Sequence, residues 1–170
     1  ILEQAESKAF LNKGLKIVVS GISEKKEFQY HNGIQDYIEK VIGKRPTLSD
    51  KPFYIEKDDK KMRLETTFQW TSGTETIVHS YANAIKTVDG GSHETGFRNG
   101  ITKALRSYIE RRKLLPKDIN NITGDDVREG LIAIINVYLQ GDVEFQGQTK
   151  GRLNSDITSQ VESVVKHSLE

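Results

Sequence analysis

An uninterrupted apolar run, Leu131 to Ile135, constrains the fold more than any other segment of this chain. A strand with one face in water alternates apolar and polar residues, whereas a run without alternation is typical of a strand covered on both faces. We therefore predict a buried strand at 131–135, around which the other elements have to be arranged.

Apolar spacing along the rest of the chain predicts both helices and strands. The predicted helices begin near Leu2, Gly33, Ser92, Thr123 and Ile157. The predicted strands cover 15–19 and 27–31, joined by a turn at 21–26, and then 53–56, 62–70 and 76–81. We expect the last three to form a β-meander. The element order predicts an α+β fold, a mixed sheet with helices mainly on one face.

Composition narrows the class of protein. The net charge is +1, from 25 basic and 24 acidic residues, and a domain that binds nucleic acid by itself is usually more basic. The absence of cysteine excludes disulfides and thiolate metal sites. No apolar run approaches the ~20 residues of a membrane span, and the opening residues have no signal-peptide layout. We expect a cytoplasmic protein that was either cut from a longer chain or processed, because it begins with Ile1.

The loop Gln148-Thr149-Lys150 is the first candidate site. A lysine ammonium on a flexible stem suits a terminal phosphate, and a glutamine amide can donate to the same oxygens. Gly147 and Gly151 flank the triplet and allow the loop to bend sharply. On these three residues alone, an ordinary solvent loop is the favoured interpretation.

Two further motifs have competing interpretations. In DGGSHETGFR (89–98) the two glycines form either an anion cradle or a tight loop before a helix capped by Ser92. We favour the tight loop, because the spacing matches no phosphate-loop signature. His93 has no second histidine at metal-ligand spacing. Asp125 and Asp126 are either acid/base or metal groups or the acidic first turn of a helix, and we favour the helix.

The long predicted helix has two different faces. Its apolar stripe is Phe97, Ile101, Ala104, Leu105 and Tyr108, and the opposite side carries Lys103, Arg106 and Lys113. A solvated charged face is the ordinary explanation of such a pattern.

Four segments taken together resemble one family. They are AFLNKGLKI (9–17), SYANAIKTVDGGSHETGFRNGI (80–101), TGDDVREGLIAII (123–135) and FQGQTKGRL (145–153). Their order and separations resemble the second domain of the ATPase subunit of bacterial type IIA topoisomerases, which is DNA gyrase B or its counterpart in topoisomerase IV. The similarity covers essentially the whole chain. GRLNSDI (151–157) is about one residue shorter than the common gyrase pattern, which leaves the choice between the two enzymes open.

The resemblance implies a ribosomal protein S5 domain 2-like fold, called the transducer. It implies a connecting helix at 1–14 from an N-terminal GHKL ATPase domain, the transducer at 15–152, and a helix at 153–170 leading towards the cleavage core. Gln148 and Lys150 are then expected to contact the γ-phosphate of ATP in the adjacent domain, with Gly147 and Gly151 as loop hinges. The predicted contacts to DNA in the subunit cavity are Arg98, Lys103, Arg106 and Lys113.

The same resemblance implies the cofactors and partners. ATP and Mg²⁺ belong to the absent ATPase domain, so the fragment is expected to be inactive, without a catalytic residue, metal or cofactor of its own. The partners are the ATPase domain, a second copy of the same protein, the DNA-cleaving partner (gyrase A or its counterpart in topoisomerase IV) and duplex DNA, with no membrane. Two rival hypotheses are an S5-like nucleic-acid-binding module and the middle domain of a mismatch-repair or chaperone GHKL ATPase.

Overall fold

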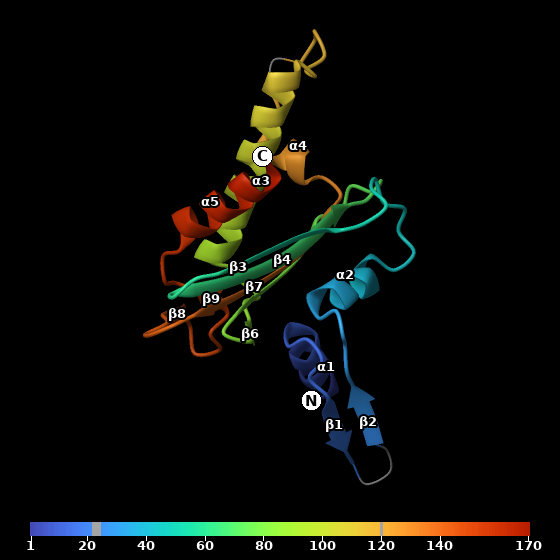
Figure 1. Ribbon diagram of the computed structural model, residues 1–170, viewed down its shortest axis with the longest axis vertical. Helices are drawn as coiled ribbons and strands as arrows, with labels where there is room; N and C mark the ends of the chain where they lie inside the picture. Colours follow the sequence, from blue (N-terminus) through green and yellow to red (C-terminus); the bar gives the residue numbers. More distant parts are fainter. Residues whose placement is uncertain (22–24, 120) are drawn as a thin grey trace.

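The strand that contains the apolar run lies at the centre of a five-stranded sheet (Figure 1). This computed structural model describes residues 1–21, 25–119 and 121–170. The strand order is β3-β4-β7-β5-β6, in which β7 is antiparallel to β4 and parallel to β5. The bounds are β3 Phe53–Asp58, β4 Met62–Trp70, β5 Ile77–Ala82, β6 Ile85–Lys86 and β7 Leu131–Leu139. The predicted β-meander is therefore wrong, because β7 separates β4 from β5.

Helices cover both faces of this sheet (Figure 1). Ala133 and Ile135 of β7 point into a core shared with α3 (Ser92–Arg112) and α5 (Thr158–Leu169). Ile132 and Ile134 point to the other face, where α2 (Ile34–Ile42) covers them. The expectation of helices mainly on one face is corrected by α2. The physical reason is that successive side chains of a strand point to opposite faces, so an unbroken apolar run needs cover on both.

The N-terminal segment forms a separate layer below α2 (Figure 1). Helix α1 (Leu2–Leu11) precedes a two-stranded hairpin of β1 (Ile17–Ser20) and β2 (Lys25–Phe28). The second strand begins two residues before its predicted start and ends at Phe28. Tyr30, beyond the strand, stacks on Phe10 at a centroid distance of 3.6 Å. Part of the predicted turn at 21–26 lies outside the described residues.

Helices α3 and α5 pack together very closely. A β-carbon on Gly96 would lie 2.5 Å from the Thr158 carbonyl oxygen, and one on Gly100 would lie 2.8 Å from Cβ of Val165. Phe97, Ile101 and Ala104 of the predicted stripe are buried. Tyr108 is 47% exposed, because the last turns of α3 extend past α5 (Figure 1).

The helix starts were predicted with mixed success. Thr123 caps α4 (Gly124–Arg128) by accepting from the Asp126 N–H, while the Asp126 carboxylate accepts from the Thr123 backbone. The predicted helix start with an acidic first turn is confirmed. The prediction for Ser92 is wrong. The N-cap of α3 is Gly91, and the Ser92 hydroxyl donates instead to the Ser155 carbonyl.

Candidate functional site

The Gln148–Lys150 segment forms the tip of a short hairpin between β8 (Phe145–Gln146) and β9 (Arg152–Leu153). All three side chains of the triplet are exposed. The tip is closed by a hydrogen bond from the Lys150 N–H to the Gly147 carbonyl, 3.2 Å. Gly147 has φ +82° and Lys150 has φ +56°. The Lys150 ammonium lies 5.7 Å from the Phe145 ring centroid, and within the described residues it forms no ion pair. It is therefore available to an anion from outside.

The base of this loop is fastened to the Asp89–Gly91 turn, which lies about 60 residues earlier in the chain. Asp89 donates its N–H to the Gly151 carbonyl at 2.8 Å, and Leu153 donates to the Gly90 carbonyl at 3.1 Å. Arg152 donates from its guanidinium to the Asp89 carbonyl at 3.0 Å. Gly151, predicted as a hinge, is buried, and its hinge role stays a prediction. Two motifs that the sequence presents separately thus form one unit.

The Gly90-Gly91 pair makes this close approach. Gly90 has φ +70° and Gly91 has φ +147°. A β-carbon on Gly91 would lie 2.5 Å from the Leu153 carbonyl oxygen, so only glycine fits without moving the backbone. The geometry supports the tight-loop interpretation of the motif.

A polar cluster lies directly behind this turn. The buried His93 ring shares a hydrogen bond with the Thr87 hydroxyl at 3.0 Å. Burial lowers the pKa of His93 to about 4, and the charge of Glu94 opposes this only in part. Ser80 donates to one Glu94 oxygen at 3.1 Å, and Arg98 binds the other at 2.6 Å. Arg98, a predicted DNA contact, is therefore engaged within the fold.

The other predicted DNA contacts are spread along α3 rather than gathered at one place. Lys103 pairs with Glu162 of α5 at 2.5 Å, and Arg106 donates to the Ile122 carbonyl at 2.7 Å. Lys113 caps the helix in the left-handed conformation (φ +52°) and is exposed. At 1.5 Å per residue, Arg98 and Lys113 are separated by about 22 Å along the helix.

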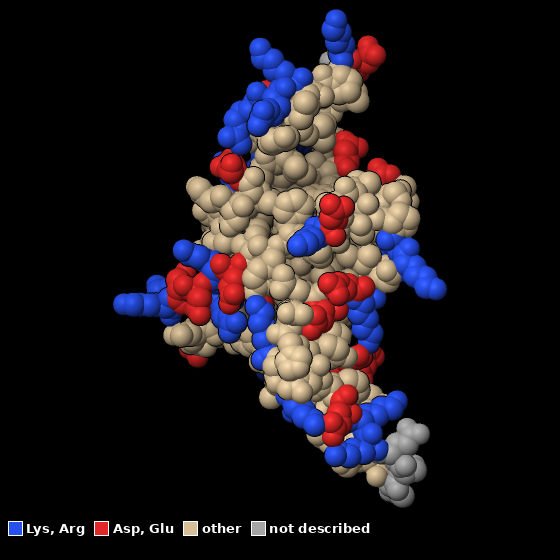
Figure 2. Space-filling view, turned by 45° about the vertical axis from the view of Figure 1, so that its right-hand side comes forward, with Lys and Arg blue, Asp and Glu red and all other residues tan. Residues whose placement is uncertain are grey.

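Lys113 belongs to a basic tip at the end of α3. The tip is defined by four exposed side chains, Arg111, Arg112, Lys113 and Lys117. Figure 2 shows Lys and Arg atoms gathered at the end of the molecule where α3 terminates. The sequence pattern indicated Lys113 but could not distinguish it from Lys103 and Arg106, which are engaged within the fold. Their partners lie on α5 and in the 121–123 segment, so they are known only from the tertiary structure.

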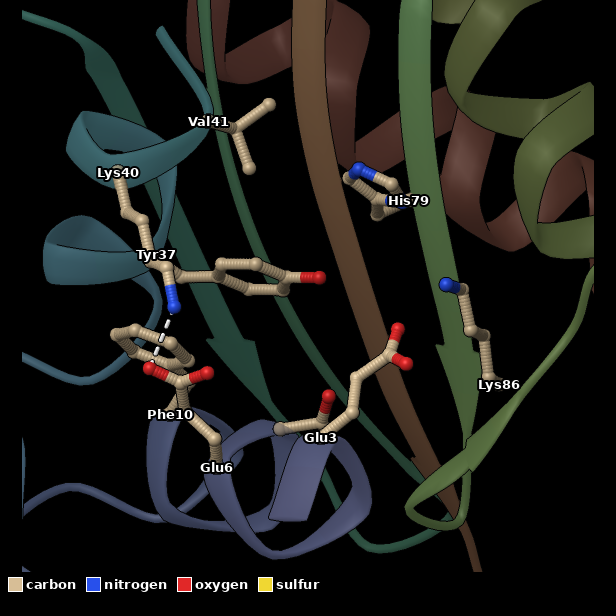
Figure 3. A pocket seen from close by; sticks show the side chains of 9 residues that line it. Glu3, Glu6, Phe10, Tyr37, Lys40, Val41, His79 and Lys86 are labelled. Atoms are coloured by element: carbon tan, nitrogen blue, oxygen red, sulfur yellow. Dashed lines mark hydrogen bonds and ion pairs between the residues drawn. The ribbon is translucent and has the colours of Figure 1, made fainter. Parts of the chain in front are cut away.

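Two hollows separate α1 from the edge of the sheet. The first, of ≈ 300 Å³, is shown in Figure 3 and is lined by α1, α2 and the β5–β6 edge. Among its lining residues, Lys40 pairs with Glu6 at 2.5 Å, and the rings of Tyr37 and His79 stack with their centroids 5.7 Å apart. The second, of ≈ 480 Å³, is lined by Glu3, Ser7 and Lys86 and also by Thr149. The Gln148–Lys150 tip therefore borders a space that faces α1.

The surroundings shift the pKa values of several side chains around the first hollow. Burial opposes ionisation of Glu6, but hydrogen bonds from Lys40 and Tyr30 outweigh it, so the pKa of Glu6 is lowered. Burial, followed by the hydrogen bond with Tyr81, raises the pKa of Tyr37. Burial and the nearby charge of Lys86 lower the pKa of His79. Sequence patterns gave no signal for this hollow, because its residues come from elements far apart in the chain.

Neither a metal site nor a membrane span is found in the described ranges. No group of three or more His, Asp or Glu side chains there could hold a metal ion. No helix among those residues is long and apolar enough to cross a membrane.

Comparison with known proteins gives a consistent set of similarities. The family model described as DNA gyrase B matches residues 33–170. The chain is 39% identical over 150 residues to the gyrase B protein of Halalkalibacterium halodurans, covering 86% of this chain and 23% of that protein. It is 36% identical over 154 residues to the gyrase B protein of Enterococcus faecalis, covering 88% of this chain and 24% of that one.

Solved structures agree with these relatives. The 43K ATPase domain of Thermus thermophilus gyrase B, in complex with an aminocoumarin, superposes with a TM-score of 0.85 at 29% identity. The match covers 99% of this chain and 46% of that one. The topoisomerase IV ATP-binding domain of Francisella tularensis superposes with a TM-score of 0.80 at 32% identity, over 99% and 45%. The chain thus spans about a quarter of the length of its curated relatives and about half of the length of these ATPase regions.

Proposed function

This chain belongs to the DNA gyrase B family, and we propose on that premise that it is the transducer part of an ATP-driven type IIA topoisomerase subunit. In this role the chain relays the state of a nucleotide bound in a neighbouring domain and contains no catalytic group of its own. It matches ATPase regions of both gyrase B and topoisomerase IV, so the proposal covers either enzyme.

We propose the domain division that the resemblance implies. Residues 1–14 connect to an N-terminal ATPase domain, 15–152 form the transducer with its S5 domain 2-like fold, and 153–170 lead towards the cleavage core. The separate layer formed by α1 supports a connecting role, since hollows lie between it and the sheet edge.

The exposed Lys150 at the tip of a fastened loop carries the proposal. An ammonium with no ion pair among the described residues has no internal contact to break before it binds a phosphate. A charge-assisted hydrogen bond contributes about 1.5–3 kcal/mol. A contact made with ATP and lost after hydrolysis therefore biases a two-state rearrangement by that amount. Gln148 supplies a second donor to the same γ-phosphate, and Gly147 and Gly151 bound the moving segment.

The proposed DNA contact is the α3 surface, from Arg98, Lys103 and Arg106 to Lys113 at the basic tip. Basic side chains on a chain of net charge +1 give weak, salt-sensitive contact to a DNA backbone without reading its sequence. Weak contact suits a segment that has to pass through a cavity. The remaining proposed partners are a second copy of the same protein and the DNA-cleaving partner protein, with ATP and Mg²⁺ bound in the ATPase domain.

The test replaces Lys150 by Ala in the complete subunit. We expect the rate of ATP hydrolysis and nucleotide-dependent dimerisation to fall about tenfold or more, because one charge-assisted contact is lost. Lys51→Ala, another exposed lysine, is the matched control and should leave both unchanged. Unchanged hydrolysis and dimerisation in Lys150→Ala would disprove the phosphate contact. Tight binding of duplex DNA by the isolated chain at moderate salt would favour the nucleic-acid-binding module instead.

A further inference from the structure

The Gln148–Lys150 tip and the start of helix α3 are joined through the three-residue turn Asp89–Gly91. β9 leaves the tip at Gly151, and both Gly151 and Leu153 are bonded to the Asp89–Gly91 turn. That turn ends one residue before Ser92, the first residue of α3. Gly91 and Leu153 also form a parallel bridge. A displacement of the tip therefore reaches the first turn of α3 without passing through the sheet.

The Asp89–Gly91 turn is held in place by close packing against β9 and against Gly151. Leu153 is 1% exposed and belongs to the core beneath α3 and α5. A β-carbon on Gly151 would lie 2.5 Å from an Asp89 carboxylate oxygen, so these two residues are in close contact. The Ser92 hydroxyl adds a second link by donating to Ser155, beyond β9. Because packed interiors change between discrete arrangements rather than deforming continuously, such a junction transmits a shift.

Arg152 is the side chain that closes the junction from the solvent side. It is exposed and donates to the Asp89 carbonyl at 3.0 Å, and it directly follows Gly151, which directly follows Lys150. Among the described residues, this is the only hydrogen bond that the Arg152 side chain makes. Arg152 can therefore be removed without opening the core.

We propose that the Asp89–Gly91 turn, called the seat below, positions Lys150 and transmits the displacement caused by its phosphate contact to the first turn of α3. Arg152 is a positioning residue in this arrangement. The inference rests on the proposed phosphate contact of Lys150. Arg152 touches no nucleotide and acts through the orientation of the tip. Losing it loosens the tip, so that the lysine is correctly placed for a smaller fraction of the time.

A mutant cycle in the complete subunit tests this proposal. The variants are Arg152→Ala, Arg152→Lys, Lys150→Ala and the double variant Lys150→Ala/Arg152→Ala, each measured for kcat and KM of ATP hydrolysis and for melting temperature. Removing one hydrogen bond corresponds to about 2- to 10-fold, so we expect kcat to fall by that factor in Arg152→Ala. Arg152→Lys retains a donor and should recover most of the loss.

The double variant separates positioning from ordinary structural support. If Arg152 acts through Lys150, the double variant has the kcat of Lys150→Ala alone, because coupled residues are not additive. Arg45→Ala is the matched control, since Arg45 makes the same kind of bond, guanidinium to the Val41 carbonyl at 2.9 Å, away from the loop. It should leave kcat unchanged.

A second measurement follows the signal into α3. A non-hydrolysable ATP analogue should slow amide hydrogen exchange in the first turns of α3 in the parent protein, and should not do so in Lys150→Ala or Arg152→Ala. If Lys150→Ala lowers kcat but Arg152→Ala does not, or if the two effects multiply, the seat is disproved while the phosphate contact stands. If Lys150→Ala itself has no effect, the phosphate contact fails and the seat fails with it.

Discussion

The Lys13 ammonium lies 3.3 Å from the carboxylate of Glu65, whose side chain is only 4% exposed. Lys13 follows α1, whereas Glu65 lies on β4, inside the sheet. Tyr54 bonds both groups, accepting from Lys13 at 2.6 Å and donating to Glu65 at 2.8 Å. The pair therefore ties the N-terminal layer to the sheet face that α2 covers.

Replacing Lys13 by Met should lower the free energy of unfolding by about 1–3 kcal/mol, because a buried carboxylate loses its cation. The loss is below that of a fully buried pair, since the Lys13 side chain is 38% exposed. Urea denaturation measures it, with Lys16→Met as the control, because Lys16 pairs with the exposed Glu27. Equal stability of both variants would contradict the prediction.

Stability should fall as the pH drops from about 6.5 to about 4, because of His93. Burial lowers the pKa of folded His93 to about 4 from an ordinary value of 6.5. In this window the unfolded chain binds a proton that the folded chain does not, so the folded state loses up to about 3 kcal/mol. Above pH 6.5 this contribution is fully present. Urea denaturation across the window should show a shallower pH dependence for His93→Gln than for the control His31→Gln, an exposed site.

Gly100→Ala should destabilise the chain although alanine is the better helix former. The propensity gain is at most about 1 kcal/mol, whereas overpacking costs about 1–3 kcal/mol, and the new methyl would lie 2.8 Å from Cβ of Val165. Thermal unfolding should show a net loss of melting temperature. Gln160→Ala, on the exposed side of α5, should show none, and a gain in Gly100→Ala would mean that α3 and α5 can separate freely.

Lys113→Ala should weaken DNA stimulation of ATP hydrolysis more than Lys103→Ala does. Lys113 is exposed at the basic tip, whereas Lys103 has to break its pair with Glu162 before reaching a phosphate. The measurement is the stimulation of ATP hydrolysis by duplex DNA in the complete subunit, titrated at several salt concentrations. The slope of the logarithm of the apparent DNA affinity against the logarithm of salt concentration should be smaller by about 1 in Lys113→Ala. The opposite ranking would place the DNA contact on the lower part of α3.

Strand β7 shows which structural features a local residue pattern can predict and which it cannot. Its unbroken apolar residues predicted a strand covered on both faces, and the structure confirms this for Ile132, Ala133, Ile134 and Ile135. The same pattern could not specify which strands flank it, and the predicted β-meander failed for that reason. Periodicity records the environment of each residue, but strand order depends on pairings between segments far apart in the chain.

The loop Gln148–Lys150 shows the same division for function. The sequence alone determined that a flexible lysine lies between glycines, and it determined the capped turn at Thr123 and the helix stripe at Phe97 and Ile101. Only the tertiary structure decided that the loop is fastened to Asp89, that Arg98 and Lys103 are already paired, and that Lys113 is exposed at the basic tip. Residue type and spacing fix local conformation and available chemistry, whereas pairing depends on distances that appear only when the chain folds.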